Sequence, residues 1–145
     1  MNNLVAVAAL IEFFEGLSPE TVGRFPEYYA VDACFKDPFN EVCGVQPIQR
    51  IFAHMFRQIS EPRFVVRERV VDDHGALLVW ELHYRLHGWW GKAGEQVIHG
   101  ASHLRFEATG KVVWHRDYWD AAEELYAKLP VIGWLLRAFK RKLAA

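Results

Sequence analysis

The stretch GKVVWHRDYWD, residues 110–120, has the pattern of a turn followed by a β-strand. It follows a Thr-Gly turn signal and is rich in β-branched and aromatic residues. Alternation with a period of two places Val113, His115, Asp117 and Trp119 on one face of this strand. A carboxylate in such company is costly to bury unless it is paired or a site uses it. Asp117 is therefore the first candidate for a functional residue.

The composition is that of one globular domain. The 145 residues are 52% apolar and 14% aromatic, which is enough to build a sizeable core, and we predict a single domain over residues 1–145. The formal net charge of −1 provides no overall field for nucleic acid, so none is expected as a partner.

The cysteines and the N-terminal segment give a prediction of the cellular compartment. Cys34 and Cys43 match no zinc or redox spacing, and we predict free thiols in a reducing, cytoplasmic compartment. Residues 4–10 are apolar, but no Lys or Arg precedes them and Glu12 and Glu15 follow, which favours an amphipathic helix over a signal peptide. No apolar run reaches membrane-spanning length, so a membrane partner is not expected.

Helices come first in the predicted order of elements, and strands follow. Helices are expected at residues 3–15, 18–25 and 47–59, and strands at 63–71, 76–87, 95–107 and 111–120, with further helices at 121–128 and 131–143. Residues 28–36 should be extended, residues 37–40 and 72–75 should be turns, and Gly88, Gly91 and Gly94 mark a hairpin region. This order predicts an α+β fold in which N-terminal helices cover one face of a curved antiparallel sheet.

Three short motifs resemble a known superfamily. ACFKDP at 33–38 is similar to the ketosteroid isomerase segment that ends in the catalytic Asp-Pro, and SHLRF at 102–106 resembles the strand of its second acid. GKVV at 110–113 followed by RDYWD at 116–120 is typical of SnoaL-like proteins. With the order of elements over essentially the whole chain, they resemble the cone-shaped superfamily of nuclear transport factor 2, ketosteroid isomerase, limonene-epoxide hydrolase and SnoaL-like polyketide cyclases. The resemblance implies a cystatin-like cone.

Site residues follow from this resemblance position by position. Asp37 matches the isomerase's general base, but its acidic oxyanion donor falls at Ser102 and its tyrosine near Ala9 or Leu10. Two of the three catalytic positions therefore depart from the isomerase, and steroid isomerase activity is not expected. Asp117 falls where the epoxide hydrolase and the cyclases keep a pocket aspartate that acts as base or acid on an apolar substrate.

The long strand at 76–87 separates an apolar row from a polar row. Trp80, Leu82 and Tyr84 should face the helices. The nearest counterparts of the hydrolase's Arg and second Asp, Glu81 and His83, should then lie outside, although a register error of one residue would exchange the two faces. Outside with them we place Arg85, His99, His103, Arg116 and Tyr118, and we expect this outer face to pair with a second subunit. The seven histidines show no metal-ligand spacing, so neither a metal nor another cofactor is predicted.

Each candidate residue also has a purely structural alternative. Asp37 precedes a proline and can cap its own turn. Asp117 can form a salt bridge to an arginine at the sheet edge. His115 can be a satisfied core histidine or, beside Asp117, an acid–base partner, because imidazole titrates near neutrality.

The C-terminal stretch, residues 129–143, combines apolar residues with a basic end. Trp134, Leu135, Leu136 and Phe139 precede Lys140, Arg141 and Lys142. Such a helix can lie on a membrane, or it can pack as a lid over the open end of the cone with its cations near the C-terminus. We predict the lid.

The predicted function is binding of a small apolar molecule in an internal pocket. Trp80, Leu82, Tyr84, Phe35, Phe52, Met55 and Phe56 should line this pocket, and Asp37, Ser102, His115 and Asp117 should be its polar groups. Asp117, assisted by His115, would move a proton on a carbonyl compound or epoxide, as an isomerase, cyclase or epoxide hydrolase does. One alternative is a carrier or sensor that binds the ligand without chemistry. The other is a protein-interaction module, which the polar residues of the inner wall make less favoured.

Overall fold

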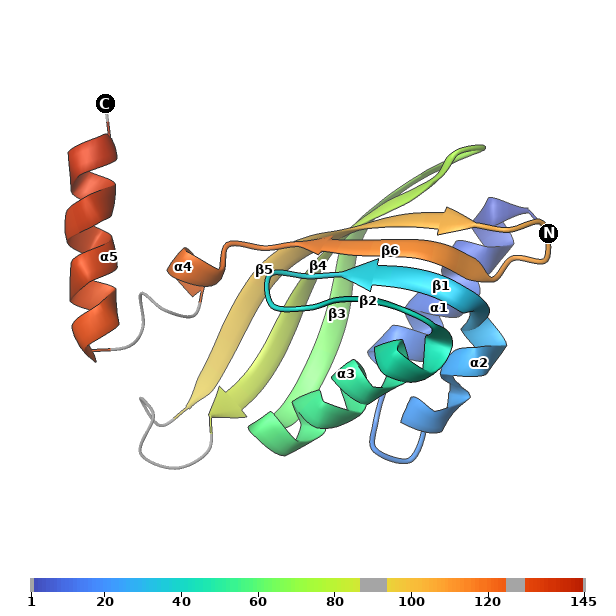
Figure 1. The fold of residues 1–145 in the computed structure, drawn as a ribbon, viewed down its shortest axis with the longest axis horizontal. Coiled ribbons are helices and arrows are strands. Elements are labelled where there is room, and N and C mark those ends of the chain that lie inside the picture. Colours follow the sequence, from blue (N-terminus) through green and yellow to red (C-terminus); the bar gives the residue numbers. More distant parts are fainter. Residues whose placement is uncertain (1, 87–93, 125–129, 145) are drawn as a thin grey trace.

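A strongly curved sheet with helices on its concave side forms the body of the protein. The computed structural model describes residues 2–86, 94–124 and 130–144. Figure 1 shows α1 (Asn3–Glu15), α2 (Phe25–Tyr28) and α3 (Val45–Gln58) on the concave side of the sheet. The chain is thus an α+β protein with helices on one side of a curved, unclosed sheet, as predicted.

Six strands make up the sheet in the order β2-β1-β6-β5-β4-β3. Their bounds are Tyr29–Lys36 for β1, Glu41–Cys43 for β2, Ile59–Asp72 for β3, Gly75–Leu86 for β4, Glu95–Phe106 for β5 and Val112–Tyr118 for β6. Neighbouring strands are antiparallel except for β1 and β6, which are parallel. Register shifts in β3 and β6 mark bulges, which increase local bending and twist.

Aromatic side chains from the helices fill the narrow end of the cone. Phe13 and Phe14 of α1, Phe25 of α2 and Phe52 of α3 are buried and lie ring against ring, with centroids 5.0 to 6.0 Å apart for the pairs that meet. Tyr29 joins this cluster from the first residue of β1. The rings hold α1 and α3 against the sheet and leave the wide end of the cone open.

The second helix is shorter and begins later than predicted. Instead of a helix at 18–25, Ser18 and Thr21 form a turn in which their side chains and backbone bond one another. A single 3-10 turn, Val22–Arg24, follows, and α2 starts only at Phe25. Pro26 lies in the first turn of α2, where its missing N–H is tolerated.

Two further details differ from the prediction, and each lies beside a register shift in the sheet. α3 ends at Gln58, and β3 begins at once with Ile59 and carries Pro62 within it, next to a register shift. At the start of β6, Val112 rather than Val113 is fully buried, because the register shifts beside Phe106. The turn expected around Gly88 and Gly91 and the end of the helix predicted at 121–128 lie outside the described residues.

The prediction of free thiols is wrong. Cys34 and Cys43 are joined by a disulfide. Residues 37–40 form the predicted turn, and the short strand β2, which sequence analysis missed, returns antiparallel to β1 so that the two cysteines are direct cross-strand partners. A hairpin register cannot be seen in a cysteine spacing alone. The cytoplasmic prediction, which rested on free thiols, loses that support.

The predicted C-terminal lid is not formed. Figure 1 shows α5 (Pro130–Leu143) standing apart from the sheet, and Trp134, Leu135 and Phe139 are exposed. An ion pair of 3.8 Å joins Lys140 of α5 to Glu123 of α4 (Ala121–Glu124). Amphipathic spacing shows that a helix has an apolar face, but it does not show which surface covers that face. In the part of the chain that the structure describes, no helix has the length and apolarity to cross a bilayer.

Candidate functional site

Two cavities meet on the concave side of the sheet. The outer cavity, of about 790 Å³, lies between α3 and the strands and has a size typical of small-molecule sites. The inner cavity, of about 20 Å³, has room for roughly one water molecule behind it. Phe52, Phe64, Trp80 and Asp117 line both. Asp117 therefore lies at the junction of the two cavities.

Strand register brings the polar residues of this junction together. Asp117 of β6 is directly opposite Ser102 of β5, and His115 is opposite Leu104. On its other side His115 is the partner of Phe35 in the parallel strand β1. The predicted alternation along β6 is thus confirmed for His115 and Asp117, which point to the concave side with Ser102 between apolar neighbours.

A chain of hydrogen bonds runs through five buried or nearly buried side chains, which we call the inner chain. Tyr29 Oη lies 2.7 Å from His115 Nδ1, and His115 Nε2 lies 2.6 Å from Asp117 Oδ1. Ser102 Oγ donates to the same Asp117 oxygen over 2.5 Å, and Trp80 Nε1 donates to Ser102 Oγ over 2.8 Å. The inner chain joins strands β1, β6, β5 and β4 across the floor of the pocket.

Donor chemistry fixes the direction of these bonds. An indole N–H can only donate, so Ser102 receives the Trp80 bond and is left to donate to Asp117. The carboxylate only accepts, so His115 donates to it from Nε2 and, as a neutral ring, accepts the Tyr29 O–H at Nδ1. All donors of the inner chain are then satisfied with a neutral imidazole.

One oxygen of Asp117 remains open. Both bonds to the carboxylate end on Oδ1, and no described residue donates to Oδ2. The Asp117 side chain is only 12% exposed, and the residue lines both cavities. Oδ2 is thus a proton acceptor held in a fixed orientation beside a largely apolar pocket.

Small residues and burial keep the inner chain in place. Gly100 is the cross-strand partner of Trp80, and a Cβ at this glycine would overlap the six-membered ring of the indole. The glycine therefore leaves the room that lets the Trp80 N–H reach Ser102. At the other end, complete burial and then the charge of Asp117 hold the pKa of Tyr29 well above its ordinary value, which keeps its hydroxyl a donor.

Tyr84 brings a second hydroxyl to the outer cavity. Its side chain is buried, and among the described residues its Oη has no hydrogen-bond partner. Burial and, to a lesser extent, the charge of Glu124 raise the pKa of Tyr84, so the phenol is protonated near neutral pH. A buried hydroxyl without a partner in a native protein calls for a water or a ligand.

The structure places the other predicted site residues as follows. Asp37, Phe35, Phe52, Met55, Trp80, Leu82, Tyr84 and Asp117 line the outer cavity, Ser102 and His115 line the inner one, and Phe56 lines neither but packs half-buried against the core. Asp37 Oδ1 accepts hydrogen bonds from the backbone N–H groups of Phe39 and Asn40 and from the Asn40 side chain. These hydrogen bonds are the ones expected if Asp37 caps its own turn, the structural alternative considered for it.

Tyr29 and the polar residues of α3 at the pocket rim are functional candidates that the sequence alone does not predict. Tyr29 had no local signal, because an aromatic residue at the start of a strand is an ordinary core residue. Arg50, His54 and Arg57 line the outer cavity and share one side of α3, at intervals of four and three residues. That spacing was available in the sequence, but only the position of α3 shows that this side borders a cavity.

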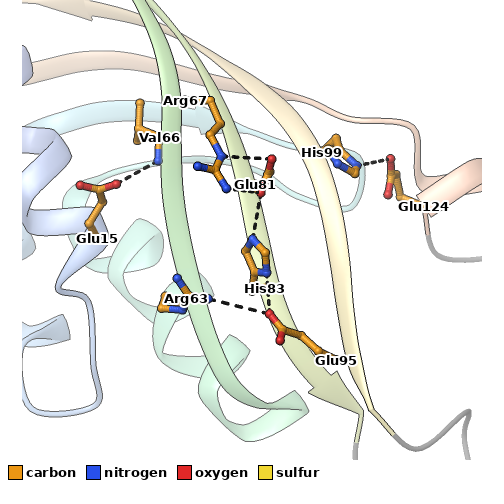
Figure 2. A network of polar contacts seen from close by, with 9 residues as sticks. All are labelled: Glu15, Arg63, Val66, Arg67, Glu81, His83, Glu95, His99 and Glu124. Atoms are coloured by element: carbon orange, nitrogen blue, oxygen red, sulfur yellow. Dashed lines mark hydrogen bonds and ion pairs between the residues drawn. The ribbon is translucent and has the colours of Figure 1, made fainter.

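A second histidine cluster lies on the convex side of the sheet (Figure 2), and we call it the outer network. His83 Nε2 contacts Glu81 at 2.9 Å, and His83 Nδ1 contacts Glu95 at 2.5 Å. Arg67 binds Glu81 and Arg63 approaches Glu95. The hydrogen bond from Arg67, followed by that from His83, lowers the pKa of Glu81 to about 2. The predicted outward face of Glu81 and His83 is confirmed.

The comparisons with known proteins place the chain in a family. The model of the SnoaL-like domain matches residues 10–115, and the chain belongs to this family. No curated protein matches the sequence.

Solved structures agree on the fold. A hypothetical protein of Catenulispora acidiphila with a ketosteroid isomerase-like fold, in complex with trimethylamine, has 16% identity and a TM-score of 0.70, covering 86% of this chain and 93% of its own. A candidate SnoaL-like polyketide cyclase of Jannaschia has 14% identity and a TM-score of 0.71, covering 87% and 90%. AclR of Streptomyces galilaeus, a candidate hydroxylase, has 13% identity and a TM-score of 0.66, covering 97% and 92%. At these identities the likeness shows the nuclear transport factor 2-like cone fold alone.

Proposed function

We propose that this protein binds a small, largely apolar molecule in the outer cavity and moves a proton on it with Asp117, without a cofactor. The observation that carries the proposal is the open Oδ2 of Asp117 beside an aromatic pocket. A few convergent polar groups in an apolar cavity are the usual build of a small-molecule site. Family membership supports the proposal at the level of fold, because candidate cyclases and hydroxylases share it.

The proposed reaction is proton abstraction next to a carbonyl group. Asp117 Oδ2 takes a proton from the carbon, and the electron pair of the broken C–H bond moves toward the carbonyl oxygen. The proton then returns to another atom of the same molecule, so that no outside reagent is consumed. The unpartnered hydroxyl of Tyr84 is the described group of the pocket best suited to donate a hydrogen bond to the oxygen.

His115 acts in this scheme as the residue that holds the base. Its Nε2–H and the Ser102 hydroxyl both bind Oδ1 and leave Oδ2 free to react. The Asp117 carboxylate, which only accepts, in turn places a proton on His115 Nε2, and Tyr29 contacts the other ring nitrogen. Asp37, whose oxygens are held within its own turn, contributes to the rim of the pocket.

A carrier or sensor without chemistry is the second candidate function. It is favoured by the hydrogen bonding of the inner chain, in which the donors of Trp80, Ser102, His115 and Tyr29 already have acceptors. Such a network also meets the needs of a polar group that is simply buried. In this case ligand affinity is insensitive to Asp117→Asn and the ligand leaves unchanged.

Exchange of carbon-bound hydrogen for deuterium separates the two functions and does not require that the substrate be identified first. A panel of cyclic and aromatic ketones is incubated with the protein in D₂O, and NMR follows deuterium uptake next to the carbonyl group. We expect protein-dependent exchange of at least one ketone, slowed by about 10²–10⁴-fold in Asp117→Asn, because a positioned general base contributes that much. Asparagine keeps an acceptor oxygen for Ser102 and His115, so the fold should persist.

Asp32→Asn is the matched control, since Asp32 is an exposed carboxylate of β1. It should leave the exchange rate unchanged. Equal rates in wild type and Asp117→Asn, for every ketone that exchanges, would contradict the catalytic proposal.

The convex face of the sheet is the proposed interface of a homodimer. Val70 of β3, Leu77 and Val79 of β4 and Tyr118 of β6 are exposed, large apolar side chains, and β3 and β4 also carry residues of the outer network (Figure 2). An apolar centre with charged groups around it is the anatomy of many subunit interfaces. Native mass spectrometry reports the subunit number and any retained ligand together, and a monomer at micromolar concentration would contradict this part of the proposal.

A further inference from the structure

The rim of the outer cavity is cationic and unpaired. Arg50, His54 and Arg57 line it from α3, and no described residue forms an ion pair or hydrogen bond with the side chain of any of the three. The arginine Cα atoms are about 10 Å apart along the helix axis, since each residue adds about 1.5 Å. Two permanent cations therefore border the entrance of an apolar pocket without a counter-charge from the described part of the chain.

The acidic residues of the same lining do not neutralise them. They are Asp37 and Asp117. Asp37 is engaged by the backbone and side chain of its own turn, and Asp117 is bound by Ser102 and His115 at the floor of the pocket. Some exposed arginines elsewhere on the molecule are paired, as Arg24 is with Glu27 and Arg67 with Glu81. The rim of the cavity is different from these surfaces.

The wall between rim and floor is apolar. It is formed by rings and aliphatic side chains of the sheet and of α3, among them Phe35, Phe52, Phe64, Leu82 and Ile98. The unpartnered group on this wall, Tyr84 Oη, is also a hydrogen-bond donor. Apart from the carboxylate at its floor, the cavity thus offers donors and cations that need acceptors from a ligand.

We infer that the ligand is an apolar molecule carrying an anionic group, such as a carboxylate, which the arginines of α3 bind at the rim while the apolar body enters the cavity. Guanidinium groups bind carboxylates in a forked geometry, and a partly apolar surrounding strengthens such contacts. This inference rests on the proposed function, because it names the class of molecule that the same pocket takes. It places the charged end at the entrance and the reacting carbon near Asp117.

Two fluorescent probes of the same shape test the inference. 8-Anilinonaphthalene-1-sulfonate carries an anionic group, and N-phenyl-1-naphthylamine is its uncharged parent. Both are titrated into wild type and into the double variant Arg50→Gln/Arg57→Gln. We expect the affinity for the sulfonate to fall about five- to tenfold in the variant, since exposed ion pairs contribute modestly, and that for the neutral probe to change less than about twofold.

Lys140→Gln/Arg141→Gln is the matched control, because it removes the same charge from α5, whose exposed apolar residues offer the sulfonate another place to bind. It should leave both affinities unchanged. If the neutral probe binds but the rim variant does not discriminate between the probes, or the control loses as much sulfonate affinity, the inference is overturned and the proposed function stands. If neither probe binds wild type, both are overturned.

Discussion

The protein carries a histidine bound to a carboxylate on each face of its sheet, and the two are built differently. In the outer network His83 lies between Glu81 and Glu95, and two arginines balance the acids (Figure 2). In the inner chain His115 meets one carboxylate and one phenol, without an arginine. Both ring nitrogens of His83 contact carboxylates, whereas His115 contacts a carboxylate with one ring nitrogen and a phenol with the other.

The difference shows what makes a carboxylate available for chemistry. Glu81 binds Arg67 with one oxygen each to two guanidinium nitrogens and also binds His83, so both of its oxygens have partners. Asp117 has both of its bonds on a single oxygen, the other oxygen has no donor among the described residues, and the residue lines a cavity. In the sequence, Glu81 with His83 and His115 with Asp117 are equivalent pairs two residues apart. The number of hydrogen-bond donors around each carboxylate oxygen distinguishes them.

Replacing His115 or His83 should show the largest difference in the free energy of unfolding between the inner chain and the outer network. His115→Asn leaves the buried Tyr29 hydroxyl without its acceptor, and we expect a loss of about 1–3 kcal/mol in the free energy of unfolding. His83→Asn opens a partly exposed network that water can hydrate, so its loss should be much smaller. Urea denaturation of both variants measures the contrast. Equal losses would mean that the inner chain is no more tightly held than the outer network.

Alkaline pH should weaken the inner chain. Burial holds the pKa of Tyr29 above its ordinary value of about 10, so the folded protein keeps a proton that the unfolded chain releases. The stabilising contribution is present below about pH 10 and is lost as the pH rises further. Urea melts between neutral and strongly alkaline pH should show a shallower decline for Tyr29→Phe than for wild type. Tyr118→Phe, at an exposed tyrosine, should follow wild type. An unchanged slope in Tyr29→Phe would contradict the burial of this phenol.

Acid should act on the outer network, with the smallest effect of the three because the groups are near solvent. The pKa of Glu81 is lowered from 4.5 to about 2, so the unfolded chain takes up its proton first. The contribution is present above about pH 4.5 and is lost as the pH falls toward 2. Glu81→Gln should therefore flatten the acid limb of the stability curve. High salt should flatten the acid limb as well, because it screens exposed charges. An acid limb that neither Glu81→Gln nor high salt changes would contradict a stabilising role of the network.

The alternation of apolar and polar residues in a strand, and the apolar stripe of a helix, predict which face of the element a side chain occupies. Alternation along β4 and β6 assigns Trp80 and Asp117 to the concave face and Glu81 to the convex one, because neighbouring side chains of a strand must point to opposite faces. The apolar stripe of α3 predicts a helix on the core in the same way. These features depend only on residues that are close together in the chain.

What the sequence does not predict depends on contacts between distant residues. Tyr29 and His115 are 86 residues apart and meet because β1 lies parallel to β6. Cys34 and Cys43 meet through a hairpin whose second strand is three residues long, too short to show a period. α5 has the predicted amphipathic pattern but not the predicted partner. In each case the local pattern leaves the partner open, and the tertiary fold decides it.

Binding of a ligand in the concave cavity, against the inner chain, is the central claim. Indole N–H signals in two-dimensional ¹H–¹⁵N NMR spectra test it directly, because Trp80 donates its N–H to Ser102 at the floor of that cavity while Trp134 is exposed on α5. The two signals are assigned with Trp80→Phe and Trp134→Phe. On addition of N-phenyl-1-naphthylamine, we predict that the Trp80 signal shifts to saturation and the Trp134 signal stays. A shift of Trp134 with an unmoved Trp80 would contradict the claim.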